Sequence, residues 1–419
     1  MGIDISSIQK QFPILQKMIG CNRLVYLDNS ATTQRPKSVI DAISRYYEET
    51  NANVFRSAYS LARRSSELYQ RAKTQFLKFI NGQNTGGVAF TKNATEALNA
   101  VAFALFYSKA KEGTLKGKWV VTTYLEHNSN YLPWARLKEW GVKLKLVSFT
   151  KDFELDYADL ENFVKSHKND IALIAVTLAS NVSGTVVDIT RVAELARKYK
   201  IPVLVDAAQG VAHLPINVKE WGIDFLAFSG HKMYGPFGIG GLYFSNAIAD
   251  KLTPFIVGGG TVTEVTEDKI EFKEKQYSLV GGTPSVADAV GLTAAVGFLT
   301  KLGMENVHNW ESYLVEYTLE KIRKLTTDFG DLVQYVGGDN KESKSGVFAF
   351  YSPLFLKADP VRFFDNEAVA VRGGKHCAHL FHKYAGVPYT LRMSLAVYNT
   401  PEDIDIFFDV LESYIRINK

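Results

Sequence analysis

The stretch Asp224-Phe225-Leu226-Ala227-Phe228-Ser229-Gly230-His231-Lys232-Met233-Tyr234-Gly235 decides the fold. It is a short, nearly continuous apolar run that ends in a polar turn with glycines. This pattern is typical of a buried parallel strand that carries a functional residue at its carboxyl end. Taken alone, Lys232 is more simply an exposed loop lysine. At a desolvated strand end, however, a lysine can act as an amine nucleophile and form a Schiff base with a carbonyl cofactor.

A second apolar run decides between these interpretations. Pro202-Val203-Leu204-Val205-Asp206-Ala207-Ala208-Gln209 ends in a carboxylate that lies 26 positions upstream of Lys232 (232 − 206). Pyridoxal phosphate needs a lysine for its aldehyde and an aspartate that faces its ring nitrogen. The two strand ends supply both residues, so we predict pyridoxal 5'-phosphate as the cofactor.

The remaining pattern predicts an α/β fold with a doubly wound, mainly parallel sheet and a smaller α+β carboxyl-terminal domain. Apolar strand patterns alternate with helical patterns of roughly ten to fifteen residues, which indicates β-α-β units with ligands beyond the carboxyl ends of the strands. We expect an arm over residues 1–24 that packs with the small domain, a large cofactor-binding domain over 25–285, and linker helices with the small domain over 286–419. Residues 261–276 are expected to form a hairpin or a mobile lid.

Composition excludes several classes of protein. The net charge of +4 is spread without a basic block, which argues against a nucleic-acid partner. Two cysteines, Cys21 and Cys377, cannot form a disulfide framework and fit a reducing compartment, so we expect a cytoplasmic protein. No apolar run is long enough for a membrane span, and the amino terminus lacks a signal-peptide pattern.

Two further motifs follow predicted strands. Residues 87–90 read as a strand and 94–106 as a helix, with Asn93 and Glu96 at capping-box spacing between them. Free N–H groups at such a turn bind anions, so Ala94 and Thr95 are candidates for the cofactor phosphate, although an ordinary capped helix would look the same. His127 follows the strand at 118–124, where a lone histidine is more often a hydrogen-bonded loop residue than a catalyst.

Cys377 lies in Val371-Arg372-Gly373-Gly374-Lys375-His376-Cys377-Ala378-His379. The two glycines and two ionisable residues before it predict an exposed, flexible, electropositive loop in which Lys375 and His376 favour the reactive thiolate. Cys21 is expected to be a buried small hydrophobe. The spacing of His, Lys and Cys here matches no tetrahedral zinc site, so we predict no metal.

Together these motifs resemble the class V aminotransferase group of fold type I pyridoxal phosphate enzymes, and most closely the group II cysteine desulfurases. The resemblance rests on Ser229-Gly230-His231-Lys232 and Asp206-Ala207-Ala208-Gln209, and it extends from Tyr26-Leu27-Asp28-Asn29-Ser30-Ala31 to Arg392-Met393-Ser394-Leu395-Ala396-Val397-Tyr398-Asn399-Thr400. Such an ordered series is far more specific than any single motif.

The resemblance implies roles for the site residues. His127 would stack on the pyridine ring and shuttle protons, which a near-neutral pKa permits. Arg392 would hold the substrate carboxylate as a planar bidentate cation, and Thr283 would reach the cofactor phosphate of the neighbouring subunit in a homodimer with shared active sites. The remaining implied residues bind the cofactor (Gln209, Ser229 and His231), the substrate (Arg372), or both (Asn181).

The implied reaction is removal of sulfur from L-cysteine, which leaves alanine and a persulfide on Cys377 for transfer to an acceptor protein, as in iron-sulfur cluster assembly. Phe55, Ser57 and Tyr59 depart from the family's His-Arg-Gly-x-His loop, Lys375 replaces a histidine, and Ala94 replaces a threonine. These departures keep open a selenocysteine lyase or another pyridoxal phosphate-dependent lyase or epimerase. A non-catalytic binding subunit is a further alternative, which the presence of Lys232, Asp206 and His127 disfavours.

Overall fold

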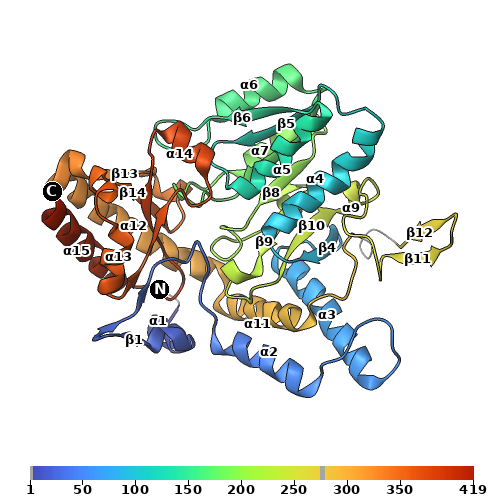
Figure 1. Cartoon of the computed structure of the whole chain (residues 1–419), viewed down its shortest axis with the longest axis horizontal. Coiled ribbons are helices and arrows are strands. Elements are labelled where there is room, and N and C mark those ends of the chain that lie inside the picture. Colours follow the sequence, from blue (N-terminus) through green and yellow to red (C-terminus); the bar gives the residue numbers. More distant parts are fainter. Residues whose placement is uncertain (1–2, 274–278) are drawn as a thin grey trace.

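The computed structural model describes residues 3–273 and 279–419 and is built around a seven-stranded sheet (Figure 1). The strands stand in the order β4 (Gly86–Thr91), β10 (Gly240–Ser245), β9 (Phe225–Ser229), β8 (Val203–Asp206), β7 (Ile171–Thr177), β5 (Trp119–Thr123) and β6 (Lys143–Val147). Strands β9, β8, β7, β5 and β6 are parallel, and β10 is antiparallel to both of its neighbours. The predicted mainly parallel α/β sheet is confirmed.

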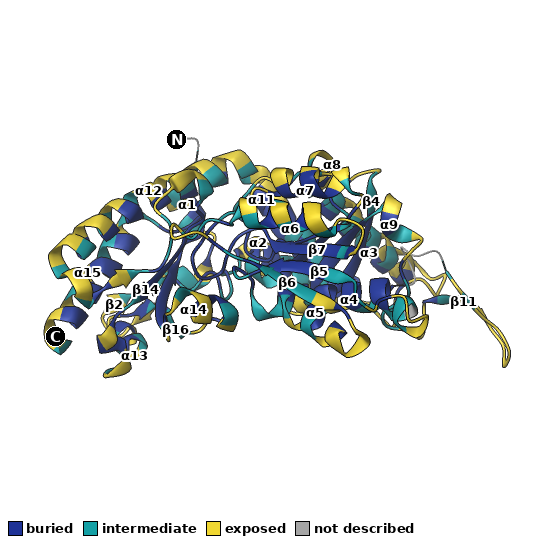
Figure 2. Cartoon of the chain, turned by 90° about the horizontal axis from the view of Figure 1, so that it is seen from above, coloured by how far each residue is buried: buried dark blue, intermediate teal, exposed yellow. Residues whose placement is uncertain are grey.

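Both faces of this sheet are buried, which explains the continuous apolar runs of its strands. In β9, Phe225 and Ala227 pack into one hydrophobic cluster, and Leu226 and Phe228 pack into another on the opposite face. Figure 2 shows the strands buried between helices whose outer faces are exposed. One face is covered by α4 (Ala94–Lys111), α5 (Leu132–Arg136) and α9 (Asn246–Ala249), and the other by α3 (Ser60–Phe79), α6 (Tyr157–His167), α7 (Ile189–Lys198), α8 (Val218–Trp221) and α11 (Val286–Leu302).

A second unit follows in the carboxyl-terminal part of the chain. Its antiparallel sheet has the order β13 (Gln334–Tyr335), β14 (Val347–Tyr351), β17 (Thr390–Ser394) and β16 (Arg372–Gly374). Helices α12 (Met304–Phe329), α13 (Pro360–Asn366) and α15 (Pro401–Asn418) pack on a separate hydrophobic cluster with these strands, and α14 (His379–Ala385) precedes β17. Short 3-10 turns lie at Pro13–Gln16, Asn128–Asn130, Leu137–Trp140, Gly230–Lys232, Gly330–Leu332, Lys341–Ser343 and Pro353–Leu356.

The amino-terminal residues contact both units. After α1 (Ile5–Gln9), the buried Phe12 packs edge-on against Tyr234, Phe298 and Tyr398. Strands β1 (Met18–Ile19) and β2 (Asn22–Arg23) pair with each other, whereas β3 (Val25–Tyr26) pairs in parallel with β15 (Val369–Ala370) of the second unit. The predicted division into an arm, a large domain and a small domain stays a prediction.

Helix α2 (Lys37–Glu49) and a hairpin complete the fold. Helices α2 and α3 pack on α11. Strands β11 (Val262–Val265) and β12 (Ile270–Phe272) form an antiparallel hairpin that extends away from the body of the molecule (Figures 1 and 2), where a hairpin or lid was predicted; the last three positions of that stretch lie outside the described residues. Among the described helices none alone is long and apolar enough to cross a membrane, and only the bent pair Val286–Leu302 and Met304–Leu332 meets those criteria when taken together.

Candidate active site

The predicted residues converge on a cavity of about 220 Å³ beyond the carboxyl ends of β5, β7, β8 and β9. The lining includes Lys232 and most of the other predicted site residues: Ala94, Thr95, His127, Asn181, Asp206, Gln209, Ser229, His231, Arg372 and Arg392. Parallel neighbouring strands end at the same edge of a sheet, which is why positions far apart in the sequence meet here.

Lys232 ends the 3-10 turn Gly230–Lys232 that follows β9. Burial lowers the pKa of its ammonium to about 8, and the carboxylate of Asp206 opposes that shift. Within the part of the chain that the structure describes, the Lys232 ammonium makes no hydrogen bond or ion pair. A buried amine with a lowered pKa is suited to nucleophilic attack on an aldehyde.

Asp206 is the last residue of β8 and is 4% exposed. Its Oδ1 accepts a hydrogen bond of 3.0 Å from the N–H of Ala208. Burial raises the pKa of this carboxyl group, while Ala208 and the positive charge of Lys232 oppose the shift. A buried carboxylate at this position would gain strongly from a cationic ring N–H.

The start of α4 lies at the same edge of the sheet. The N–H of Ala94 donates to Ser229 Oγ at 2.9 Å, and Thr95 Oγ1 lies 2.7 Å from Ser129 Oγ. The N–H groups of the first helical turn have no partner within the helix and carry its positive dipole end. Gly240 of β10 packs against this turn so closely that a Cβ atom there would lie 2.7 Å from Asn93 Cα.

His127 follows β5, and its ring Nδ1 accepts a hydrogen bond of 3.1 Å from the N–H of Ser129. Burial, followed by the charges of Lys232, Arg372 and Arg392, lowers the pKa of His127 to about 3. The near-neutral pKa that was predicted for His127 is therefore wrong for the protein without a bound cofactor. Its imidazole is neutral, with the proton on Nε2.

Glu126 was missed in the sequence, although it directly precedes His127. Its fully buried carboxyl group accepts hydrogen bonds from Thr123 Oγ1 (2.7 Å), Asn130 Nδ2 (2.6 Å) and the N–H of Thr177 (3.0 Å). These contacts tie the end of β5 to the end of β7 beneath the His127 turn. Burial raises the pKa of Glu126 to about 8 despite the three donors.

Arg392 of β17 is 1% exposed and reaches the cavity from the second unit. Its Nη2 donates to Asp28 Oδ1 at 2.9 Å and its Nη1 donates to the carbonyl oxygen of Asn181 at 3.0 Å. Among the described residues, its Nε has no partner, and neither has the buried Oδ1 of Asn181. The ion pair between Arg392 and Asp28 is therefore not a surface pair.

Cys377 is exposed on the loop between β16 and α14. Cys21 is exposed as well, so the burial predicted for it is wrong. The loop is anchored, because the carbonyl of Cys377 accepts from the N–H of Asn128 at 2.7 Å and that of His376 accepts from Asn181 Nδ2 at 2.8 Å. The flexibility predicted from its glycines is thus not supported by its contacts. Both His376 (φ 50°) and Cys377 (φ 54°) adopt the left-handed conformation, which is strained for residues other than glycine.

His376 differs from its predicted role. Its ring is 4% exposed, and Nε2 lies 2.9 Å from Thr390 Oγ1. Burial, followed by the charge of Arg392, lowers the pKa of His376 to about 2, so this residue brings no positive charge to Cys377. Lys375, the other basic residue predicted to favour the thiolate, is exposed.

Other predicted residues stay outside the cavity lining. Thr283 and Lys375 are exposed, and Phe55 and Tyr59 are each 54% exposed. Phe55 adopts a positive φ of 67° and contacts Tyr69 edge-on. No cluster of three or more His, Cys, Asp or Glu side chains suited to a metal occurs in residues 3–273 and 279–419.

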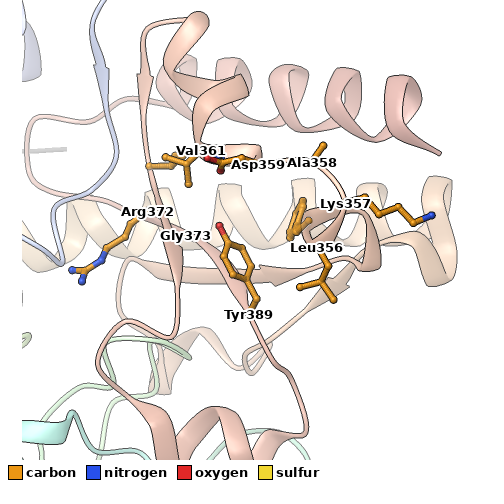
Figure 3. Close-up of a pocket in the computed structure, with 10 residues that line it drawn as sticks. Leu356, Lys357, Ala358, Asp359, Val361, Arg372, Gly373 and Tyr389 are labelled. Carbon is orange, nitrogen blue, oxygen red and sulfur yellow. The ribbon is translucent and has the colours of Figure 1, made fainter.

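A larger hollow of about 600 Å³ lies on the second unit. It is a different cavity from the one lined by Lys232 and Asp206. It is bordered by Leu356, Lys357, Asp359, Val361 and Tyr389. Figure 3 shows the Arg372 side chain extending away from Tyr389 and Leu356. Arg372 also lines the smaller cavity, so it borders both. The convergence of buried charges identifies the smaller cavity as the candidate active site.

The model of the family described as "Aminotransferase class-V" matches residues 25–407. The chain belongs to the class V aminotransferase family. This assignment confirms the predicted family and, with it, the predicted cofactor, pyridoxal 5'-phosphate.

Several similar proteins are named cysteine desulfurase or probable cysteine desulfurase. A probable cysteine desulfurase of Synechocystis sp. is 36% identical over 413 residues, which cover 98% of this chain and 96% of that protein. Among solved structures, a cysteine desulfurase of Thermococcus onnurineus NA1 superposes with a TM-score of 0.88 at 31% identity, covering 98% of each chain. A cysteine desulfurase of Escherichia coli gives a TM-score of 0.87 at 28% identity over the full length of both chains.

The residues of this cavity fit the cofactor. Lys232 supplies an amine of lowered pKa for the aldehyde, Asp206 a buried carboxylate for the ring nitrogen, and α4 the positive end of its helix dipole for the phosphate. The unpartnered Oδ1 of Asn181 and Nδ1 of His376 leave hydrogen-bond acceptors in the cavity lining. Buried polar atoms of this kind are rare unless a ligand satisfies them.

Proposed function

We propose that the protein is a cysteine desulfurase that converts L-cysteine to L-alanine and retains the sulfur as a persulfide on Cys377. The observation that carries the proposal is an exposed thiol on an anchored loop beside a buried lysine site. Cys377 directly follows His376, which lines the cavity together with Lys232 and Arg392. The exposed position leaves the thiol open to a second protein.

Bound at Lys232, pyridoxal phosphate supplies an electron sink for the pair left when an amino acid loses its α proton. Lys232 Nζ holds the cofactor aldehyde and then moves the α proton. Asp206 keeps the ring nitrogen protonated, and the neutral His127 covers the ring. The phosphate is held by Ala94, Thr95, Ser229 and His231, and Gln209 completes the cofactor contacts.

The protein's own thiol carries the sulfur chemistry. Arg392, with Arg372 and Asn181, holds the substrate carboxylate and directs the substrate sulfur toward the loop of Cys377. The Cys377 thiolate attacks that sulfur, forming an S–S bond as the substrate's Cβ–S bond breaks. The electron pair stays on Cβ, which takes up a proton, so the products are L-alanine and a persulfide on Cys377 and no external oxidant is required.

Several finer features belong to the same proposal. We place the protein in the group II subtype, in the cytoplasm, with a sulfur-acceptor protein as its partner. A homodimer is supported by large apolar side chains exposed on the hairpin and the 51–59 loop: Val265 (60%), Ile270 (60%), Phe55 (54%) and Tyr59 (54%). Exposed patches of this kind mark protein contacts. Thr283 would reach the partner subunit's cofactor phosphate.

The deciding experiment replaces the thiol. Cys377→Ala should lose alanine formation from L-cysteine while the cofactor's visible absorbance is retained, because no residue then accepts the sulfur. Cys21→Ala, which removes the other exposed free thiol, should behave like the parent and serves as the control. If Cys377→Ala still releases alanine from L-cysteine at the parental rate, the persulfide mechanism fails and a lyase mechanism replaces it.

A further inference from the structure

Arg392 is held in place by a residue at the other end of the chain. Asp28 Oδ1 lies 2.9 Å from Nη2, and it is the only carboxylate within ion-pair distance of Arg392 in residues 3–273 and 279–419. With Nη1 bonded to the carbonyl of Asn181, two separate segments fix the plane of the guanidinium. The buried Nε–H remains without a partner in the cavity lining.

From this geometry we infer that Asp28 is a positioning residue for amino-acid recognition: it orients Arg392 so that the Nε–H faces the carboxylate of the incoming amino acid. A guanidinium binds a carboxylate well only when its planar donors are aligned with the two oxygens. A side chain fixed in that plane before binding loses less freedom on binding. Without the Asp28 carboxylate, the buried guanidinium of Arg392 would lose its counter-charge and one of the two hydrogen bonds that hold it.

The backbone around Asp28 is fixed independently of its carboxylate. Ser394, two residues after Arg392, donates its N–H to the carbonyl of Leu27 at 2.6 Å, and its Oγ accepts from the N–H of Ser30 at 2.8 Å. Asn29 Nδ2 also donates to the carbonyl of Ser394 at 2.7 Å. Substitution of the Asp28 side chain therefore leaves the segment attached to β17.

The charges around the cavity support the same role. Burial raises the pKa of Asp28, whereas Arg392, Arg372 and Lys232 stabilise its ionised form. Its carboxylate thus offsets part of a strongly cationic site while it holds the arginine. Because L-cysteine is the proposed substrate, this role rests on the proposed function, but any amino acid with an α carboxylate would depend on it.

The test compares two ligands by titration of the cofactor-loaded protein, followed by the change in the cofactor's visible absorbance. L-Alanine carries the α carboxylate, and ethylamine is the matched amine without it. Neither ligand contains sulfur, so the readout stays valid even if the protein is not a desulfurase. Asp28→Ala should bind L-alanine about tenfold more weakly or worse, with ethylamine binding unchanged.

Two further variants sharpen the result. Asp28→Asn keeps an oxygen acceptor for Nη2 and should bind L-alanine within about threefold of the parent. Glu412→Ala, which breaks an exposed ion pair with Arg416, should bind both ligands normally. Parental L-alanine binding by Asp28→Ala, an equal loss for ethylamine, or an Asp28→Asn protein as weak as Asp28→Ala would each overturn the inference.

Discussion

Gly240 offers a direct test of the phosphate-binding turn. Its position in β10 brings the strand against the start of α4, so a Cβ atom would lie 2.4 Å from Phe228 O, 2.7 Å from Asn93 Cα and 2.9 Å from Asn93 C. All three are backbone atoms, which cannot swing aside as a flexible side chain can. We therefore expect Gly240→Ala to push the turn away from its place and to weaken cofactor binding.

The size of the effect follows from the contact. Overpacking against a rigid neighbour costs about 1–3 kcal/mol, and each 1.4 kcal/mol is a tenfold change in an equilibrium constant. If the strain is relieved by moving Asn93 and Ala94, the cofactor dissociation constant should rise about 5- to 150-fold. The constant is measured by adding pyridoxal 5'-phosphate to the cofactor-free protein and following its visible absorbance.

Gly297 provides the matched control. It lies on the exposed side of α11, and a Cβ there would meet no atom within 4 Å. Gly297→Ala should leave cofactor affinity unchanged and stabilise the helix by about 0.5–1 kcal/mol. A Gly240→Ala protein that binds the cofactor with parental affinity would refute the assignment of this turn to the phosphate.

Two further predictions concern buried charges. Asp206→Asn should keep the fold and still bind the cofactor but lose most turnover of L-cysteine, and a parental rate would contradict the role of the carboxylate. His213 Nδ1 lies 2.8 Å from Glu311 Oε2; burial acts to lower the pKa of His213, but the Glu311 carboxylate outweighs it and raises that pKa. The His213–Glu311 pair therefore stabilises the fold fully at pH values below about 6.5, which is the pKa of a histidine in the unfolded chain. This stabilisation is lost as the pH rises through the pKa of His213 in the folded protein. His213→Gln, which leaves Glu311 buried without its partner, should cost about 3–5 kcal/mol, with a larger loss of melting temperature at pH 6 than at pH 9.

The sequence was sufficient where the signal is local. Apolar runs and the polar residue at each run's end placed Asp206 and Lys232 correctly, because a strand buried on both faces has to be apolar along its length. The helix predicted at 94–106 is likewise observed, at Ala94–Lys111.

The sequence was insufficient where the structure depends on distant partners. Asp28 and Arg392 are 364 residues apart in the sequence, and no sequence pattern at either position predicts that they pair. The buried ring of His376 likewise contacts Thr390, which lies on strand β17. A histidine beside a cysteine therefore looked like a source of positive charge, when its surroundings keep it neutral. Glu126 could have been found, since it is a charged residue that closely follows an apolar strand and directly precedes His127.

In the proposed function, these distant pairings allow one cavity to bind two anionic groups, the cofactor phosphate and the substrate carboxylate, at separate places. Lys232, Arg372 and Arg392 are offset in this region by Asp206 and Asp28, so cationic side chains outnumber the carboxylates. The phosphate donors come from the α4 turn of the large sheet, whereas Arg392 and its holder Asp28 come from segments tied to β17 of the second sheet. A cofactor phosphate and a substrate carboxylate would thus be held by different parts of the fold. Cofactor binding and amino-acid binding should therefore be separable by mutation, with Gly240→Ala weakening the first and Asp28→Ala the second.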